Sequence, residues 1–268
     1  MLDHLNTQGV VVLGCGKMGG ALLRGWLAAG LRADSVTIID PALPDEIAQL
    51  GVQHGDTPSS AGVCVLAVKP QIMAQALPSV AHLGGGETLF VSVAAGTTLD
   101  SLAEALGPGT PIVRAMPNTP AAIGQGISAL VGNEHVRPDG LDLAEVLMAA
   151  VGQTVRLDSE AQMDAVTAVS GSGPAYVFHL IETLAAAGEA EGLPAPMAMA
   201  LAKATVAGAG QLALGDTSPD QLRVNVTSPG GTTAAALDVL MDPHAGFSPL
   251  LRKAVGAARA RGAELARA

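Results

Sequence analysis

The sequence predicts an α/β protein in which an N-terminal, Rossmann-type doubly wound sheet (residues 1–157) is followed by an all-α C-terminal domain (residues 158–268). Two observations lead to this prediction. Up to about residue 157, short β-branched runs alternate with amphipathic segments, which is typical of a parallel sheet covered by helices. Beyond Asp158 the strand-like runs stop, and long segments rich in Ala, Leu and Met follow.

The strands expected in the first domain are continuous apolar runs, as a sheet buried on both faces requires. They lie at 9–14, 36–40, 63–68, 88–93, 111–116, 126–131 and 153–157. The helices expected between them lie at 18–30, 44–51, 71–80, 99–106 and 139–150.

The second domain is expected to contain helices whose apolar residues cover more than one face. These helices lie near 160–168, 174–191, 196–214, 218–226, 231–241 and 247–266. Such faces either pack against another subunit or belong to a well-buried helical core, and the sequence alone does not choose between these alternatives.

Composition and charge exclude several classes of function. The formal charge is −10 with only 14 Lys and Arg and no basic cluster, so we expect no nucleic-acid partner. The two cysteines, Cys15 and Cys64, form neither a disulfide framework nor a metal-ligand spacing, so we expect no metal site and a reducing, cytoplasmic compartment. The apolar runs are shorter than the roughly 20 residues that span a bilayer, so we expect no membrane insertion.

The stretch GCGKMGG (14–20) predicts a dinucleotide-binding turn between the first strand and the first helix. Gly14 permits a sharp turn, Gly16 lets the backbone approach a pyrophosphate, and Gly19 lets the helix pack closely on the strand. The same spacing also occurs in ordinary glycine-rich turns, so the prediction of a dinucleotide site depends on the predicted sheet around the turn. The other residues expected to line the cofactor here are Cys15, Lys17 and Met18.

Asp40 ends the second predicted strand, about 20 residues beyond the last glycine. At that position a carboxylate hydrogen-bonds the adenosine ribose and repels a 2′-phosphate. The stretch DPALPDE has no Arg or Lys to bind that phosphate, so Asp40 favours NADH over NADPH. The alternative is an ordinary Asp-Pro turn.

Three further loops follow predicted strands at the carboxyl end of the sheet, where open α/β folds bind ligands. They read AVKPQ (67–71), AAGTT (94–98) and RAMPNTP (114–120). For the last of these, a plain turn is an equally simple interpretation. The cofactor-binding residues expected from these loops are Ala67, Val68, Lys69, Pro70, Ala95 and Asn118.

Together with AVSGSGPAYVFHLIE, EGLP and NVTSPGGTTAAALDVL, these motifs occur in an order that resembles the Δ1-pyrroline-5-carboxylate reductases over nearly the whole chain. The resemblance implies a Rossmann domain followed by a dimerisation domain, assembled as a homodimer or a ring of dimers. It also implies NAD(P)H-dependent reduction of 1-pyrroline-5-carboxylate to L-proline, the last step of proline biosynthesis. Many members of the family use NADPH, which competes with the preference suggested by Asp40.

The turn SPGGTT (228–233) precedes a predicted helix whose first N–H groups are free to bind an anion. Gly230, Gly231, Thr232 and Thr233 are therefore expected to bind the substrate carboxylate, while Ser228 either caps the turn or adds a contact. By resemblance, the Thr233 hydroxyl reaches the imine nitrogen, either to donate a proton or to orient the ring. The alternative is a simple helix cap.

One further residue and two rival functions remain open. By resemblance Asp216 lies near the substrate nitrogen, but GDTSPD reads equally well as a turn before a Ser218 cap, and no role is assigned to it. A β-hydroxyacid-dehydrogenase-like enzyme needs a catalytic Lys on the helix that reads GPAYVFHLIE, which has none. The glycine turn is also compatible with another imine reductase or with a non-catalytic dinucleotide sensor.

Overall fold

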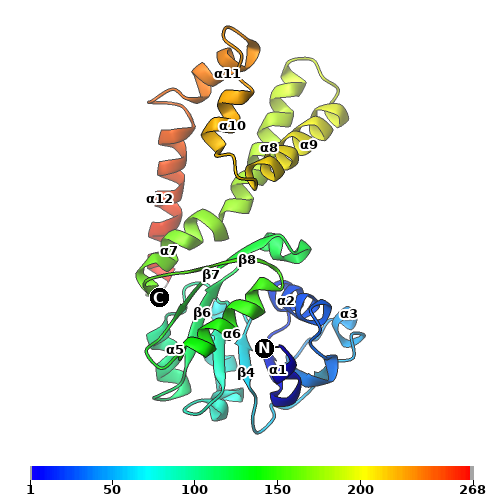
Figure 1. Cartoon of the computed structure of the whole chain (residues 1–268), viewed down its shortest axis with the longest axis vertical. Coiled ribbons are helices and arrows are strands. Elements are labelled where there is room, and N and C mark those ends of the chain that lie inside the picture. Colours follow the sequence, from blue (N-terminus) through cyan, green and yellow to red (C-terminus); the bar gives the residue numbers. More distant parts are fainter. Residues whose placement is uncertain (1, 266–268) are drawn as a thin grey trace. The chain divides into compact units, whose positions relative to one another are not determined.

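The structure is a computed structural model that describes residues 2–265 (Figure 1). The chain divides into two compact units. One unit contains the described residues up to Gly171 together with those from Arg259 onward, and the other is Ser172–Ala258. The domain boundary expected at residue 157 stays a prediction. The contacts within the chain group residues 158–171 with the sheet.

The first unit is built on a mostly parallel sheet, and the predicted fold class is confirmed. Its strands lie in the order β3-β2-β1-β4-β5-β6-β7-β8. Strand β7 runs antiparallel to β6 and parallel to β8, and the other neighbours are parallel. The strands are β1 Val10–Leu13, β2 Val36–Ile39, β3 Gln53–His54, β4 Val63–Leu66, β5 Leu89–Ser92, β6 Ile112–Met116, β7 Gly126–Gly132 and β8 Gly152–Arg156.

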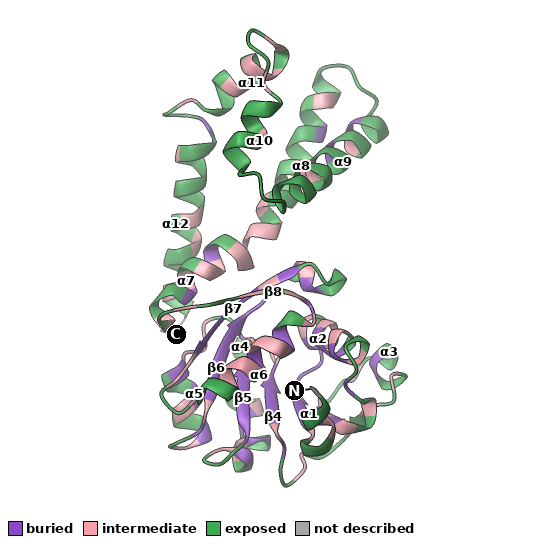
Figure 2. Ribbon diagram, viewed as in Figure 1, coloured by how far each residue is buried: buried purple, intermediate pink, exposed green. Residues whose placement is uncertain are grey.

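Helices cover both faces of the sheet, so alternate residues of a strand enter different cores. Val10 and Val12 belong to the core formed with α1, α2, α3 and α6, whereas Val11 and Leu13 belong to the core formed with α4 and α5. Figure 2 shows the strands buried between these layers. The helices are α1 Leu2–Gln8, α2 Lys17–Ala28, α3 Asp45–Ala48, α4 Pro70–Ala76, α5 Leu99–Leu106 and α6 Pro138–Ala149.

Two elements of this unit are absent from the sequence-based expectation. Helix α1 precedes the first strand, and its Leu5 is fully buried. Strand β3 consists of two exposed polar residues, Gln53 and His54, and pairs with β2 at the edge of the sheet. Neither segment has the apolar run from which the other strands were expected.

The chain changes direction at β1, which lies between β2 and β4. After β1 the chain builds β2 and β3 on one side and then returns to build β4 on the other, which makes a topological switch point. Leu13, the last residue of β1, lies opposite both Ile39 and Leu66. The segments that follow these three strands therefore begin together at one edge, which we call the carboxyl edge.

The remaining elements are helical. In the first unit, α7 and a π-helical turn follow β8, and the last turns of α12 belong to the same unit. Their bounds are α7 Met163–Val166, π-turn Thr167–Gly171, α8 Gly173–Ala190, α9 Ala195–Ala213, α10 Pro219–Asn225, α11 Thr232–Leu240 and α12 Phe247–Leu265. The last residue of the helix expected at 247–266 lies outside the described residues.

The second unit has a small core of its own. Helices α8 and α9 bury Ala185, Ala198 and Ala202 against each other, with Ile181 and Met199 partly buried beside them. Large apolar side chains stay exposed on the same helices, among them Phe178 at 59% and Met197 at 52%. Figure 2 shows these helices as largely exposed. Monomeric proteins rarely expose so much apolar surface. The exposure of these side chains therefore favours packing against another subunit over a well-buried helical core.

Candidate active site

The glycine turn (residues 14–19) leaves β1 in a conformation that suits glycine at its first position. Gly14 has φ +86°, in the region that L side chains rarely adopt, and its N–H donates to the carbonyl of Ile39 at 2.9 Å. A Cβ on Gly14 would lie 2.6 Å from Cγ1 of Val68 and 2.9 Å from the Val68 backbone nitrogen. The turn is therefore pressed against the segment that follows β4.

Gly19 and Gly16 have different roles in this turn. A Cβ on Gly19 would lie 2.6 Å from the carbonyl oxygen of Gly14, so Gly19 permits close packing of α2 on the strand. Gly16 is the exposed N-cap of α2, with φ −70° and no atom within 4 Å of a Cβ placed on it. The open space at Gly16 adjoins the helix N-terminus, as a bound pyrophosphate requires.

The three other residues predicted in the turn differ in exposure. Lys17 is exposed and Met18 is half-buried in the first turn of α2, whereas Cys15 is buried. Burial, with a further contribution from the negative charge of Asp40 and against the effect of Arg24, raises the pKa of the Cys15 thiol to about 11. This thiol is therefore protonated near neutral pH and is not a nucleophile.

Asp40 lies directly beside the glycine turn. Its Oδ2 accepts the N–H of Cys15 at 2.7 Å, and its Oδ1 accepts the N–H of Ala42 at 2.9 Å. The imidazole Nε2 of His54, at the end of β3, lies 2.8 Å from the Asp40 carbonyl oxygen. Because a carboxylate has about four lone-pair positions, Asp40 keeps the capacity to accept further hydrogen bonds while it holds the turn.

The loops after β4 and β5 reach the same carboxyl edge. The N–H of Ala67 donates to the carbonyl of Leu13 at 2.8 Å, which continues the β1–β4 pairing by one residue. Val68 follows, Lys69 is the N-cap of α4, and Pro70 is the first residue of that helix, where its missing N–H costs nothing. Ala95 is exposed in the loop after β5.

Asn118, which the sequence predicts at the cofactor, is already hydrogen-bonded at both ends of its carboxamide. Oδ1 accepts the N–H of Ile127 at 3.0 Å, and Nδ2 donates to Oγ of Ser170 at 3.3 Å. Ser170 belongs to the SGSGP motif and lies in the π-helical turn. The carboxamide therefore joins the loop after β6 to this turn.

Sequence reasoning did not single out Arg114 or Glu160, which the structure brings together at the same edge. Arg114 on β6 is 5% exposed, and its Nη1 lies 2.5 Å from Oε1 of Glu160. The same Oε1 accepts the N–H of Leu99, the first residue of α5, at 2.8 Å. An Arg inside an apolar strand indicates a buried charged partner. The sequence does not identify that partner, because Glu160 lies 46 residues away.

The turn at residues 228–233, called the substrate turn because the sequence predicts that it binds the substrate carboxylate, lies in the second unit and opens α11. Gly230 has φ +68°, and the N–H of Gly231 donates to the carbonyl of Ser228 at 3.0 Å. Gly231 is the N-cap, so Thr232 and Thr233 lie in the first turn of the helix. Their backbone N–H groups have no acceptor within α11, as at any helix start. The use of the Gly231 N–H inside the turn was not expected from the sequence.

Two nearby sequence expectations also have their local structure. The helix expected at 218–226 forms as α10, with Ser218 at the N-cap and Pro219 at the first helical position. Asp216 lies in the preceding turn and is exposed. Its role stays open.

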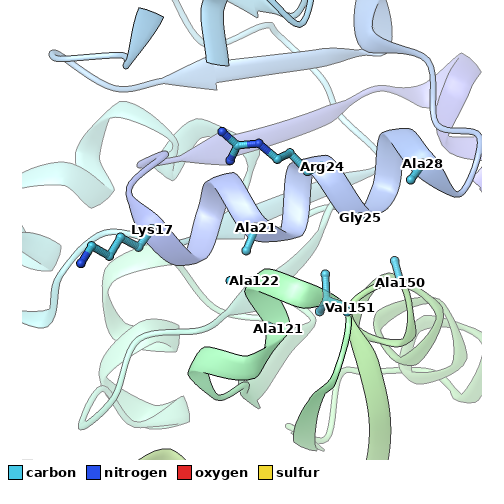
Figure 3. A pocket seen from close by; sticks show the side chains of 10 residues that line it. Lys17, Ala21, Arg24, Gly25, Ala28, Ala121, Ala122, Ala150 and Val151 are labelled. Carbon is cyan, nitrogen blue, oxygen red and sulfur yellow. The ribbon is translucent and has the colours of Figure 1, made fainter. Parts of the chain in front are cut away.

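Figure 3 shows a pocket of about 320 Å³ between α2 and the segments around Ala122 and Val151. Ala and Gly residues line most of it, and of the residues predicted at the cofactor it includes Lys17. The side chains of Arg24 and Lys17 extend away from Val151 and Ala150. The pocket thus lacks the convergent polar groups that orient a ligand.

The described part of the chain, residues 2–265, contains neither a cluster of metal-ligating side chains nor a membrane-spanning helix. No group of three or more His, Cys, Asp or Glu side chains there is placed to hold a metal ion. No helix within the same residues is long and apolar enough to cross a bilayer.

A glycine turn at a switch point, a carboxylate after β2 and open space at a helix N-terminus place the first unit in the class of dinucleotide-binding Rossmann domains. A family model described as "NADP oxidoreductase coenzyme F420-dependent" matches residues 9–96, and one described as "Pyrroline-5-carboxylate reductase dimerisation" matches residues 160–265. A pyrroline-5-carboxylate reductase from Pseudomonas aeruginosa is 40% identical over 270 residues, which cover 98% of each chain. The chain belongs to the pyrroline-5-carboxylate reductase family.

Solved structures agree with this assignment. A pyrroline-5-carboxylate reductase from Coxiella burnetii superposes with a TM-score of 0.90 at 36% identity, covering 97% of this chain and 98% of the other. A pyrroline carboxylate reductase from Plasmodium falciparum, solved with NADP bound, gives 0.84 at 27% identity and covers 97% and 99%. The resemblance read from the motifs is confirmed, and nothing favours a hydroxyacid dehydrogenase or a sensor.

The two glycines Gly14 and Gly16 give the first prediction. Gly16→Ala fits the free fold because its Cβ meets open space, so we expect an unchanged melting temperature but at least about tenfold weaker binding of a nicotinamide coenzyme. Gly14→Ala is the matched comparison, and it lowers the melting temperature because its Cβ collides with Val68. Calorimetry and fluorescence titration measure both quantities. Unweakened coenzyme binding in Gly16→Ala would show that the phosphates do not bind there.

Proposed function

We propose that this protein reduces the cyclic imine 1-pyrroline-5-carboxylate to L-proline with a nicotinamide coenzyme. The observation that carries the proposal is family membership across both parts of the chain, because the matched relative covers the sheet with its glycine turn as well as the helical segment. The open N-terminus of α2 fits the pyrophosphate of such a coenzyme. A bound reduced coenzyme supplies the hydride.

The chemistry needs positioning more than acid catalysis. Hydride adds to the imine carbon, the electron pair of the C=N bond moves to nitrogen, and the nitrogen keeps or takes up a proton. Because a pyrroline nitrogen is basic, it carries that proton for part of the time near neutral pH. A ketone reductase must instead stabilise a developing alkoxide. The main task of this chain is therefore to hold the substrate ring against the coenzyme.

We assign the coenzyme to the carboxyl edge. The backbone of Gly14, Cys15 and Gly16 and the N-terminus of α2 face its phosphates, and the exposed Lys17 adds positive charge beside Met18 and Gly19. The loops after β4, β5 and β6 contact the rest of the coenzyme toward its nicotinamide end. The residues proposed there are Ala67, Val68, Lys69, Pro70, Ala95 and Asn118.

The substrate carboxylate is assigned to the substrate turn. The N–H groups of Gly230, Thr232 and Thr233 and the positive end of the α11 dipole attract an anion. The Gly231 N–H closes the turn on Ser228, so these two residues shape the cradle, and Ser228 keeps its hydroxyl for a further contact. The Thr233 hydroxyl, half-buried at the second helical position, is proposed to reach the imine nitrogen.

We also propose where and in what assembly the enzyme works. The dimerisation segment and the exposed apolar helices support an oligomer, and we propose a homodimer that can assemble further into a ring of dimers. Two buried free cysteines are consistent with a cytoplasmic enzyme, because a reducing compartment keeps thiols free.

Turnover tests the proposed function directly. The purified protein, given pyrroline-5-carboxylate and a reduced coenzyme, is expected to oxidise the coenzyme and form proline, which nicotinamide absorbance and amino-acid analysis measure. Omission of the imine is the control. Absence of turnover with both NADH and NADPH would refute the function.

Asp40 predicts the preference between the two coenzymes. Its carboxylate stands where an adenosine 2′-phosphate would come, so kcat/KM is expected to favour NADH. Asp40→Asn keeps an acceptor for the N–H of Cys15 but removes the charge, and it should narrow the preference by about tenfold or more. A large preference of the unmodified enzyme for NADPH would contradict this prediction.

The Thr233 hydroxyl gives a separate prediction. Thr233→Ala is expected to lower kcat/KM for the imine by more than about tenfold, a loss above about 1.4 kcal/mol. Thr233→Ser, which keeps the hydroxyl, is the matched variant and should stay within about threefold, whereas Thr233→Val, which keeps the shape, should fall with the Ala variant. Unchanged kinetics in Thr233→Ala would remove the hydroxyl from the mechanism.

A further inference from the structure

Arg114 is a buried cation in an apolar strand. It lies on β6 with Val113 and Ala115 as neighbours and is 5% exposed. A guanidinium in such surroundings needs a charged partner, and Glu160 provides one at 2.5 Å. The Glu160 side chain is 28% exposed, so the pair lies at the boundary between the core and solvent.

Glu160 has a second attachment. Its Oε1 accepts the N–H of Leu99, one of the amides at the start of α5 that have no acceptor inside the helix. A negative charge at this position is also favoured by the helix dipole. One carboxylate oxygen therefore joins β6 to the first turn of α5.

Glu160 is itself held by a capping box. The side chain of Ser159 accepts a backbone N–H of the short turn that begins at Glu160, and the side chain of Gln162 accepts the Ser159 N–H in return. The Asp158 N–H also donates to Oε1 of Gln162, at 3.0 Å. The backbone that carries the Glu160 carboxylate is thus fixed independently of Arg114.

The three connected segments lead to places that the proposed function uses. The loop just before Leu99 contains Ala95, and the chain just after Arg114 leads to Asn118. From Glu160, which is also the first residue matched by the dimerisation model, the chain runs to the π-helical turn, where Ser170 accepts from Asn118. The segment between Glu160 and Gly171 is therefore attached to β6 at one end and to the loop after β6 at the other.

We propose that Arg114 and Glu160 form a positioning pair that fixes the β5–α5 loop and the start of the dimerisation segment for hydride transfer. This inference rests on the proposed function, because the β5–α5 loop is assigned there to the coenzyme. Neither side chain touches the reacting atoms. The pair acts through the loop and the segment that it holds.

A purely structural role is the alternative, and stability separates the two. Removing one partner leaves the other charge buried without a partner and destabilises the fold, whereas replacing both with well-packed apolar side chains is often neutral. The double variant Arg114→Met/Glu160→Ala is therefore expected to keep the fold without the Arg114–Glu160 pair. Glu160→Gln keeps a carboxamide oxygen that accepts from both Arg114 and the Leu99 N–H.

The test is a single-turnover, stopped-flow measurement of coenzyme oxidation by the full-length enzyme with excess pyrroline-5-carboxylate. The amplitude reports the fraction of active enzyme, and the rate constant reports how well the reactants are positioned. Both Glu160→Ala and the double variant are expected to show a rate constant lowered about tenfold, with Glu160→Gln within about threefold of the unmodified enzyme. Calorimetry should place the double variant near the unmodified protein in melting temperature.

Glu87→Ala is the matched control, because Glu87 precedes β5 and forms a surface ion pair with Arg137 in which the two side chains are 89% and 71% exposed. It should change neither quantity. A double variant that transfers hydride at the unmodified rate, or variants that lose amplitude alone, would overturn the positioning pair. No oxidation by the unmodified enzyme with either coenzyme would instead refute the proposed function.

Discussion

The close passage of the chain from β1 into α2 is the constraint on which the rest of the site depends. Gly14 has a positive φ and lies against Val68, and Gly19 packs against the Gly14 carbonyl, so α2 begins close to the end of β1. Asp40 holds the peptide between them through the Cys15 N–H. This arrangement leaves the N-terminus of α2 open at Gly16 and gathers the loops after β1, β2 and β4 at one edge.

The sequence predicts most of this architecture because local patterns encode it. Buried parallel strands read as continuous apolar runs, and glycines that must avoid a Cβ have a recognisable spacing. The missing elements lack such signals. Strand β3 consists of two exposed polar residues, the antiparallel direction of β7 depends on pairing with β6, and the contact of Arg114 with Glu160 joins residues distant in sequence.

For the helical unit, the amino-acid composition leaves two alternatives open, and the structure favours one of them. Apolar residues on several helix faces suit either a buried core or a subunit interface. In the structure the buried core of this unit reduces to three alanines, while Phe178 and Met197 stay exposed. The match to a dimerisation domain agrees with this distribution.

The substrate turn and the glycine turn apply the same physical principle. We propose that each binds an anion through backbone N–H groups at a helix N-terminus, in the substrate turn without a lysine or arginine in residues 225–240 except Arg-free and Lys-free backbone donors, in a chain whose formal charge is −10. In such sites hydride transfer depends on how the reactants are positioned. The Arg114–Glu160 pair is proposed to contribute to that positioning.

The hydride transferred from the coenzyme to the imine can be followed with an isotope. Pyrroline-5-carboxylate is reduced with a nicotinamide coenzyme that carries deuterium at the transferable C4 position, and the product is analysed by mass spectrometry and NMR. The expected product is L-proline with one deuterium at C5, the former imine carbon. Proline without deuterium, or no proline at all, would contradict it.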